Sequence, residues 1–282
     1  MGSAYRAVAD LERSEESFNV ALAFLEDEAL APYQDPLARA RLAQRAAYLR
    51  CDQQRFPEAL ELVDEAIALL QNLEASHALG IALIDRAVIT GRSGDPAKAL
   101  SFLEQALGQL HPQSHPYGYL AAAHNMAVYL FELAQTPEDH QETLVWQRLV
   151  ADLHARHPRG FDLLKLQVLL GLTLVRAGQV DGGIAELWAA QKGFGEMDAF
   201  YDQAIALLYL ASIYLALNRP DQVKRLAGQL FPIFRHLAID RETTAALMLF
   251  YNAAQAESAS TELVAQVTAE VESSAGGPPH LS

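Results

Sequence analysis

A position for a small side chain recurs at the start of successive predicted helices, and this recurrence constrains the fold more than any other feature. The intervals between successive positions are 45, 40, 44, 40 and 40 residues. Such a period is typical of a solenoid, in which each helical unit packs on its neighbours in chain order. The repeated positions are Ser14, Ala59, Ala99, Thr143, Gly183 and Val223.

The small side chains have a steric explanation. Two antiparallel helices that are joined by a tight turn approach each other most closely near that turn, and a large side chain there would push them apart. We expect Gly171 and Gly183 to form the closest such pair. Because glycine inside a helix costs about 1 kcal/mol relative to alanine, close packing must offset this cost.

Residues 204–217 and the segment after them show the helical unit most clearly. The apolar side chains of residues 204–217 fall three to four residues apart, so they share one helix face. Residues 218–221, Asn-Arg-Pro-Asp, are typical of a turn that places proline at the start of the next helix. The two facing apolar stripes are Leu207, Leu210, Ala211 and Tyr214, and then Val223, Ala227 and Leu230.

This pattern resembles the tetratricopeptide (TPR) repeat, whose usual period is about 34 residues. The longer period here would lengthen the helices and not the loops. The resemblance implies an all-α, right-handed superhelical solenoid, and the segments between turns predict about thirteen helices with no strand. The best matches are Leu170, Gly171, Leu174, Gly178, Gly183, Leu187 and Ala190, followed by Leu210, Ala211, Tyr214 and Val223.

One repeat domain is expected over residues 1–272, and it begins in mid-repeat because residues 4–8 would form only the end of a first helix. The weakest unit is 126–149, where a stretched turn at 135–138 would account for the four additional residues in the spacing. The last helix is expected to end at Glu272. Residues 273–282 are polar and contain Gly-Gly-Pro-Pro, so they are expected to form a disordered tail.

Charge and cysteine content restrict the possible partners and compartment. The chain carries 35 acidic and 21 basic residues, which gives a net charge of −14. This balance argues against nucleic acid and against an anionic membrane surface, which both attract clustered Lys and Arg. Cys51 is the only cysteine, so no intramolecular disulfide can form, as expected for a cytoplasmic protein. No uncharged run is long enough to span a membrane.

No motif in the sequence demands a chemical reaction. P-loop, dinucleotide-binding and HExxH patterns are absent. His154 and His157 lie three residues apart and could ligate zinc or nickel, but the sequence indicates no third ligand. Cys51 has no general base beside it, so an inert thiol is expected. We therefore expect no catalytic residue, metal or cofactor, and we expect that the chain is not an enzyme.

The first helix of each unit lines the concave face in TPR arrays, and the resemblance therefore implies a binding face here. Five of the twelve side chains that the 40-residue register places on this face are Arg or Lys. A mildly basic groove would attract an acidic peptide or a C-terminal carboxylate. Alternatively, these are solvated polar positions that pair with Asp52, Asp85 and Glu132. The twelve residues are Arg41, Gln44, Arg45, Tyr48, Asp85, Arg92, His124, Asn125, Lys165, Arg176, Tyr209 and Ser212.

The expected function is a non-catalytic scaffold that binds a protein or peptide. The long period and the residues 231–234, Phe-Pro-Ile-Phe, are similar to TPR regions of bacterial regulatory proteins. This resemblance implies the docking or regulatory part of a larger bacterial system. Two alternatives remain open. One is a sensor of a small ligand or signal peptide, with a pocket near Arg92, His124 and Asn125. The other is an accessory subunit of an enzyme.

Overall fold

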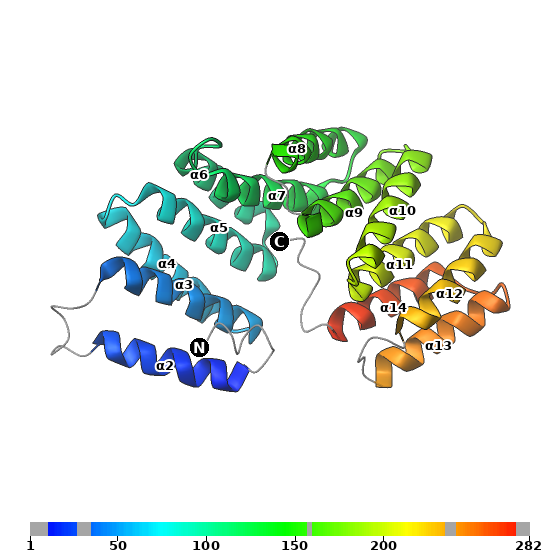
Figure 1. The fold of residues 1–282 in the computed structure, drawn as a ribbon, viewed down its shortest axis with the longest axis horizontal. Helices are drawn as coiled ribbons and strands as arrows, with labels where there is room; N and C mark the ends of the chain where they lie inside the picture. The colour runs from blue at the N-terminus through cyan, green and yellow to red at the C-terminus, as the bar shows by residue number, and fades with distance from the viewer. Residues whose placement is uncertain (1–10, 27–34, 157–159, 235–240, 275–282) are drawn as a thin grey trace. The chain divides into compact units, whose positions relative to one another are not determined.

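The computed structural model describes residues 11–26, 35–156, 160–234 and 241–274. These residues form thirteen helices and no strand (Figure 1), which confirms the all-α prediction for the described part of the chain. The predicted helix end at residues 4–8 lies outside it, as do residues 275–282 of the predicted tail. The helices are α2 (Leu11–Glu26), α3 (Pro36–Asp52), α4 (Phe56–Asn72), α5 (Ser76–Arg92), α6 (Pro96–Gln109), α7 (Pro116–Leu133), α8 (Pro137–Arg156), α9 (Gly160–Arg176), α10 (Val180–Glu196), α11 (Phe200–Ala216), α12 (Pro220–Phe234), α13 (Arg241–Gln255) and α14 (Thr261–Ser274).

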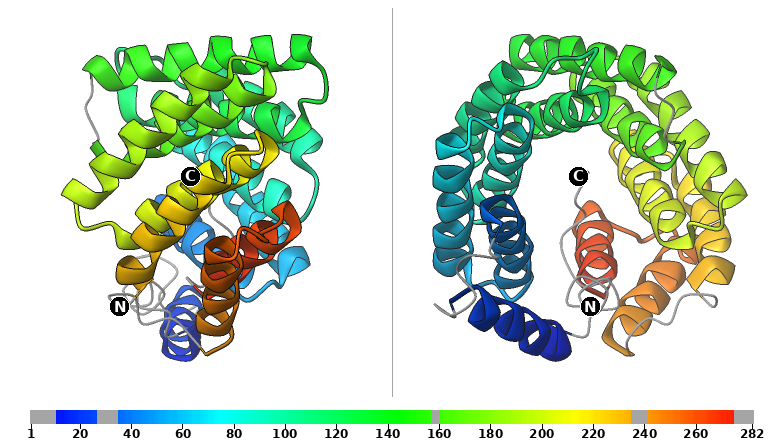
Figure 2. Two further views of the ribbon diagram at one scale, coloured as in Figure 1. Left: turned by 90° about the vertical axis from the view of Figure 1, so that its right-hand side faces the viewer. Right: turned by 60° about the vertical axis from the view of Figure 1, so that its left-hand side comes forward.

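The helices group into two compact units that are described separately. Unit 1 contains α2 to α7, and unit 2 contains α8 as far as His154 together with α9 to α14. Within each unit, most helices that follow one another in the chain pack side by side (Figure 2). In unit 1 the first helices of successive pairs also contact each other, α3 with α5 and α5 with α7. The first helices of unit 1 therefore form a layer of their own.

The repeat register is confirmed by the burial of all six predicted small positions. Each lies at the fourth residue of its helix in α2, α4, α6, α10 and α12. A large side chain at this site would separate the two helices of a pair. The buried residues are Ser14, Ala59, Ala99, Thr143, Gly183 and Val223.

The prediction of a stretched turn before Thr143 was wrong. The turn is as short as the others, and the additional residues extend the start of α8, where Thr143 is the seventh residue. A reciprocal capping arrangement explains the early start. The Asp139 backbone N–H donates to Thr136 Oγ1 over 3.2 Å, and the Asp139 carboxylate accepts from the backbone N–H of Thr136 over 2.9 Å. This pair satisfies backbone donors of the first turn and stabilises the additional turn.

Most turns between helices are closed by one residue in the left-handed region, at intervals of 20 residues. In unit 1 these are Gln54, Glu74 and Gly94, with φ of 58°, 50° and 99°. In unit 2 the same interval recurs at Gly178, Asp198 and Asn218, with φ of 81°, 56° and 54°. The next backbone N–H then reaches back five residues, as from Arg55 N to Arg50 O over 2.8 Å. This is a Schellman-type helix end, and it fixes the length of each helix.

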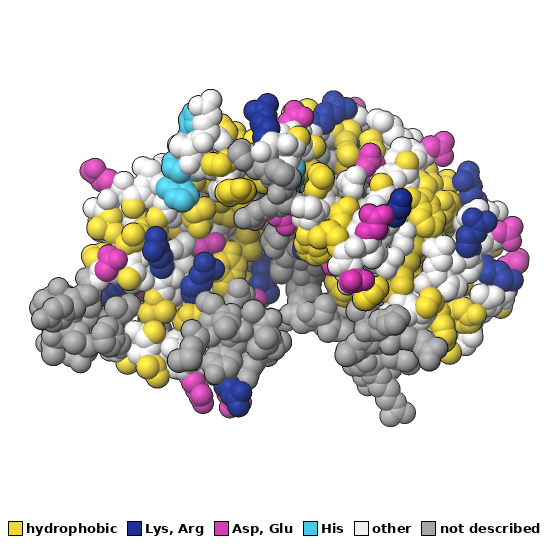
Figure 3. Space-filling view, viewed as in Figure 1, with side chains coloured by type: hydrophobic (Ala, Val, Ile, Leu, Met, Phe, Trp, Pro, Cys, Tyr) yellow, Lys and Arg dark blue, Asp and Glu magenta, His cyan; other side chains and the backbone are white. Residues whose placement is uncertain are grey.

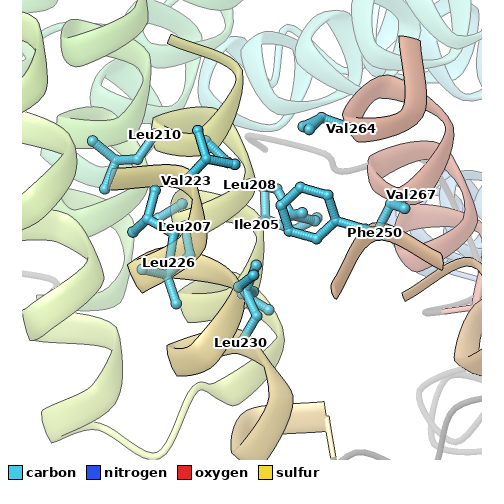
Figure 4. Packing of buried hydrophobic residues seen from close by; sticks show 14 of the residues in the cluster. Ile205, Leu207, Leu208, Leu210, Val223, Leu226, Leu230, Phe250, Val264 and Val267 are labelled. Atoms are coloured by element: carbon cyan, nitrogen blue, oxygen red, sulfur yellow. The ribbon is translucent and has the colours of Figure 1, made fainter. Parts of the chain in front are cut away.

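The core of unit 2 confirms the predicted apolar faces of α11 and α12. Leu207 and Leu210 of α11 face Val223 and Leu226 of α12, and all four are at most 1% exposed (Figure 4). Phe250 of α13 packs in the same cluster with valines of α14. The cluster includes residues from every helix from α9 to α14. The last helix, α14, ends at Ser274, two residues beyond the predicted end at Glu272.

Candidate functional site

Two arginines and a tyrosine form a stripe along the first helix of unit 1. Arg41, Arg45 and Tyr48 of α3 are separated by four and three residues, so they lie on one helix face. Arg41 and Arg45 are exposed, and neither makes a hydrogen bond or ion pair with another described residue. Tyr48 is half-buried. We call these three residues the α3 stripe.

Asp85 of α5 holds one end of the α3 stripe in place. Its Oδ1 accepts a hydrogen bond from the Tyr48 hydroxyl over 2.8 Å, and its Oδ2 accepts one from Gln44 Nε2 over 2.7 Å. Gln44 and Asp85 are buried, at 8% and 9% exposure. Hydrogen bonds to an ionised carboxylate are stronger than neutral ones. The Asp85 carboxylate therefore fixes Tyr48 and joins α3 to α5.

A partly buried ion pair lies at the far end of the same helix face. Arg92 Nη1 of α5 donates to Asp52 Oδ1 of α3 over 2.8 Å, and the two side chains are 11% and 21% exposed. Asp52 is four residues beyond Tyr48, so it continues the α3 stripe. At Arg92 the structure thus matches the alternative interpretation, in which a predicted groove cation pairs with an acidic neighbour.

Two other predicted binding residues of unit 1 are buried within α7. His124 and Asn125 are each 6% exposed. The Asn125 amide donates to the backbone carbonyl of Ala121 over 2.9 Å. A partner at the surface would meet little of either side chain, because their polar groups face the packed interior of unit 1.

Lys165, a predicted binding residue of unit 2, is less exposed than Arg41 and Arg45. Lys165 Nζ of α9 lies 5.1 Å from the centroid of the Phe161 ring. Burial raises the pKa of Asp202 in α11, and the positive charge of Lys165 opposes this shift. A cation over an aromatic ring and beside a carboxylate is already partly compensated. Lys165 therefore contributes less attraction to a partner than its charge suggests.

Arg176 and Tyr209 form a second neighbouring pair in unit 2. Although Arg176 retains exposed surface, partial desolvation lowers its pKa, and the nearby Tyr209 opposes this shift. Tyr209 and Ser212 are both half-buried on α11. The guanidinium stays charged at neutral pH, because an arginine pKa that is lowered by partial desolvation remains far above neutrality. Arg176 therefore keeps its charge at an exposed position of unit 2.

An acidic residue of α2 is bound by several donors, in a cluster that the repeat pattern did not predict. Glu15 Oε2 accepts from Gln53 Nε2 over 2.8 Å, and its Oε1 accepts from Arg55 Nη1 over 3.1 Å. Arg50 also donates to Oε1. The hydrogen bond from Gln53 and the two guanidiniums lower the pKa of Glu15.

The described residues do not bring metal-ligating side chains together. None of them form a group of three or more His, Cys, Asp or Glu side chains that could hold a metal ion. His154 is 2% exposed, and His157 lies outside the described residues. The Cys51 thiol is buried among Ala47, Ala59 and neighbouring apolar side chains. In the part of the chain that the structure describes, no helix has the length and apolar character needed to cross a membrane.

Comparisons with known proteins identify the repeat class. Residues 37–109 match the family model of the tetratricopeptide repeat, and this span begins in α3 and ends in α6. No curated protein matches the sequence. A solved structure entitled the apo form of RapI is similar to 96% of this chain and 96% of its own, with a TM-score of 0.70 and 10% identity. At this identity the likeness concerns the fold alone. The chain therefore contains a TPR-like helical repeat region, as predicted.

Proposed function

We propose that the chain is a non-catalytic scaffold that binds an acidic segment of a partner protein or peptide along the α3 stripe. TPR-like repeats are typical of protein-interaction scaffolds. The observation that carries the proposal is the pair of exposed guanidiniums of Arg41 and Arg45, which no described residue binds. We further propose that the protein acts in the bacterial cytoplasm as the docking or regulatory part of a larger system.

The geometry of the α3 stripe suits a carboxylate. Arginine presents a planar fork of N–H donors that can bind both oxygens of a carboxylate. Arg41 and Arg45 lie one helical turn apart, so alternate acidic side chains of an extended peptide, which share one face, could each meet one guanidinium. Tyr48 supplies a half-buried ring beside them, and its hydroxyl is held by Asp85. The partner therefore meets a surface that is already ordered, which reduces the entropic cost of binding.

Charge supports the same proposal at longer range. The chain as a whole carries −14, so an acidic ligand is repelled by most of the surface. A local basic stripe then directs such a ligand to one place. The Asp52–Arg92 ion pair neutralises one end of the stripe. We therefore place the acidic residues of the partner nearest Arg41 and Arg45.

A selection from a random peptide library tests this proposal and needs no purified partner. Immobilised wild-type protein should enrich peptides that are rich in Asp and Glu or that end in an accessible carboxylate. The double variant Arg41→Glu/Arg45→Glu should lose this enrichment. Lys98→Glu/Lys192→Glu is the matched control, because it reverses the same number of charges at exposed positions on the second helices α6 and α10. Enrichment that is equal in all three proteins, or that has no acidic bias, would contradict the proposal.

A further inference from the structure

One exposed face of α12 carries a lysine, a glycine and a phenylalanine. Lys224, Gly228 and Phe231 are separated by four and three residues, so they lie along one side of the helix. Phe231 is 42% exposed. The buried side of α12 contains Val223, Leu226, Ala227 and Leu230, which face the core of unit 2. The face with Gly228 is therefore turned away from that core.

Packing against the described residues does not explain Gly228. A Cβ atom added to Gly228 would meet no atom within 4 Å, whereas one added to Gly183 would meet the backbone of α9. Glycine inside a helix costs about 1 kcal/mol relative to alanine. Gly228 lies in the interior of α12, so it does not serve as a helix end. Because Gly228 has no side chain, the helix surface there leaves room for a side chain from outside the unit.

The neighbouring helix α13 extends the same surface with large apolar side chains. The rings of Phe231 and Tyr251 have centroids 5.3 Å apart, so the two helices present one continuous face. Met248 lies one turn before Tyr251 and is 42% exposed, and Leu249 is 59% exposed. Figure 3 shows exposed hydrophobic side chains over this part of unit 2. We call Gly228, Phe231, Met248 and Tyr251 the α12–α13 surface.

Positive charge borders the α12–α13 surface. Lys224 and Arg225 are exposed, and neither makes an ion pair with a described residue. Lys and Arg side chains are visible at the same edge of the molecule in Figure 3. A suitable occupant is therefore a helix with small or medium apolar side chains on one side and carboxylates at one end.

The outer face of α2 has this composition. Glu12, Glu16, Val20 and Ala23 follow one another at intervals of four, four and three residues, so they share a face. All four are exposed, and Val20 is 72% exposed. Neither Glu12 nor Glu16 is paired with a described residue. Arg13 lies at the border of this face and leaves it acidic on balance.

We propose that the α12–α13 surface of one copy of the chain docks the α2 face of a second copy. Val20 and Ala23 lie against Gly228, Phe231 and Met248, and the two glutamates lie opposite Lys224 and Arg225. The contact joins two different surfaces, so it is heterologous and can continue from copy to copy. The mass of the assembly should therefore rise with protein concentration and should fall as salt screens the charged pairs.

Charge exchange between the two surfaces tests this contact with the full-length chain. Sedimentation velocity should show association of the wild type, and both Glu12→Lys/Glu16→Lys and Lys224→Glu/Arg225→Glu should be monomeric. An equimolar mixture of the two variants should associate again, because each altered surface then meets an oppositely charged one. Circular dichroism verifies that each variant is folded.

Two control proteins carry the same changes in net charge at other exposed sites. Glu61→Lys/Glu104→Lys and Lys98→Glu/Lys192→Glu should associate like the wild type. Gly228→Leu should weaken association without lowering the melting temperature, because its side chain enters open space in the single copy. A monomeric wild type at every concentration would overturn the proposal. Association that survives either charge reversal, or a mixture that stays monomeric, would overturn it as well.

Discussion

A Cβ atom on Gly183 would lie 2.5 Å from the backbone carbonyl oxygen of Gly171, so α9 and α10 meet backbone to backbone at these two glycines. The contact is reciprocal, because a Cβ atom on Gly171 would lie 2.9 Å from the carbonyl oxygen of Gly183. Real side chains do not occupy such distances, and backbone atoms cannot rotate away as a flexible side chain could. This close approach is the one that the repeat spacing predicted.

Enlarging Gly183 should therefore destabilise unit 2. We expect Gly183→Leu to lower the free energy of unfolding by roughly 1–3 kcal/mol, because overpacking forces the two helices apart. Gly182→Ala is the matched control, since its Cβ atom would lie 3.8 Å from Leu174 and alanine favours the helix. Denaturant unfolding followed by circular dichroism measures both variants. Equal stability of Gly183→Leu and the wild type would show that the two helices do not meet here.

The left-handed turn residues lead to a pair of opposite predictions. Gly94 has φ of 99°, and an L residue in the left-handed region costs roughly 1–2 kcal/mol. Gly94→Ala should therefore lower the melting temperature. Gln54 already adopts φ of 58°, so Gln54→Gly should remove this strain. Its gain is smaller because glycine loses more backbone entropy on folding. Thermal unfolding that changes in the same direction for both variants would contradict the turn assignment.

Glu15 should make the stability of unit 1 depend on acid. Its pKa is lowered in the folded protein by the hydrogen bond from Gln53 and by Arg50 and Arg55. A depressed carboxyl pKa adds stability above the unfolded-state value, near 4.5, and this stability is lost as pH falls through the folded-state pKa. Glu15→Gln should reduce stability at neutral pH and flatten its decline in acid. The exposed Glu61→Gln should leave the profile of melting temperature against pH unchanged.

Asp85 should be needed both for stability and for the shape of the α3 stripe. Asp85→Ala leaves the buried Gln44 amide and the Tyr48 hydroxyl without their acceptor, which costs roughly 1–3 kcal/mol. Asp85→Asn keeps one oxygen acceptor and should lie between the alanine variant and the wild type. Chemical denaturation gives the order of the three proteins. An alanine variant as stable as the wild type would show that this hydrogen-bonded node does not hold α3 to α5.

The spacing of small residues was sufficient to predict the helix pairs, because the steric requirement at a close helix contact is local. It did not reveal the additional turn of α8. That turn depends on the reciprocal hydrogen bonds between Thr136 and Asp139, which a strict repeat register overlooks. The left-handed residues Gln54, Glu74 and Asp198 carry no signal of their own, since glycine and asparagine are the residues expected there. Their regular interval becomes visible only in the structure.

The repeat register predicted which helices carry the candidate binding residues, but it did not predict which of their charged side chains stay exposed. The register placed Arg45 and Arg92 alike on first helices, yet one is exposed and the other is paired with Asp52. That difference depends on which side chains meet between neighbouring helices. The same limit applies to His124, which the register placed on the binding face and which is buried. The α12–α13 surface was missed because the sequence alone does not show that Gly228 faces open space.

The most direct test of the proposed function is the salt dependence of binding between the wild-type chain and an acidic peptide obtained by library selection. Fluorescence anisotropy at salt concentrations from about 0.05 M to about 0.5 M covers the range over which exposed charge pairs become screened. We predict that affinity falls steadily with salt. At low salt, Arg41→Glu/Arg45→Glu should bind at least roughly tenfold more weakly, which is about 1.4 kcal/mol. Affinity that does not respond to salt and is equal in the wild type and this double variant would contradict recognition by the α3 stripe.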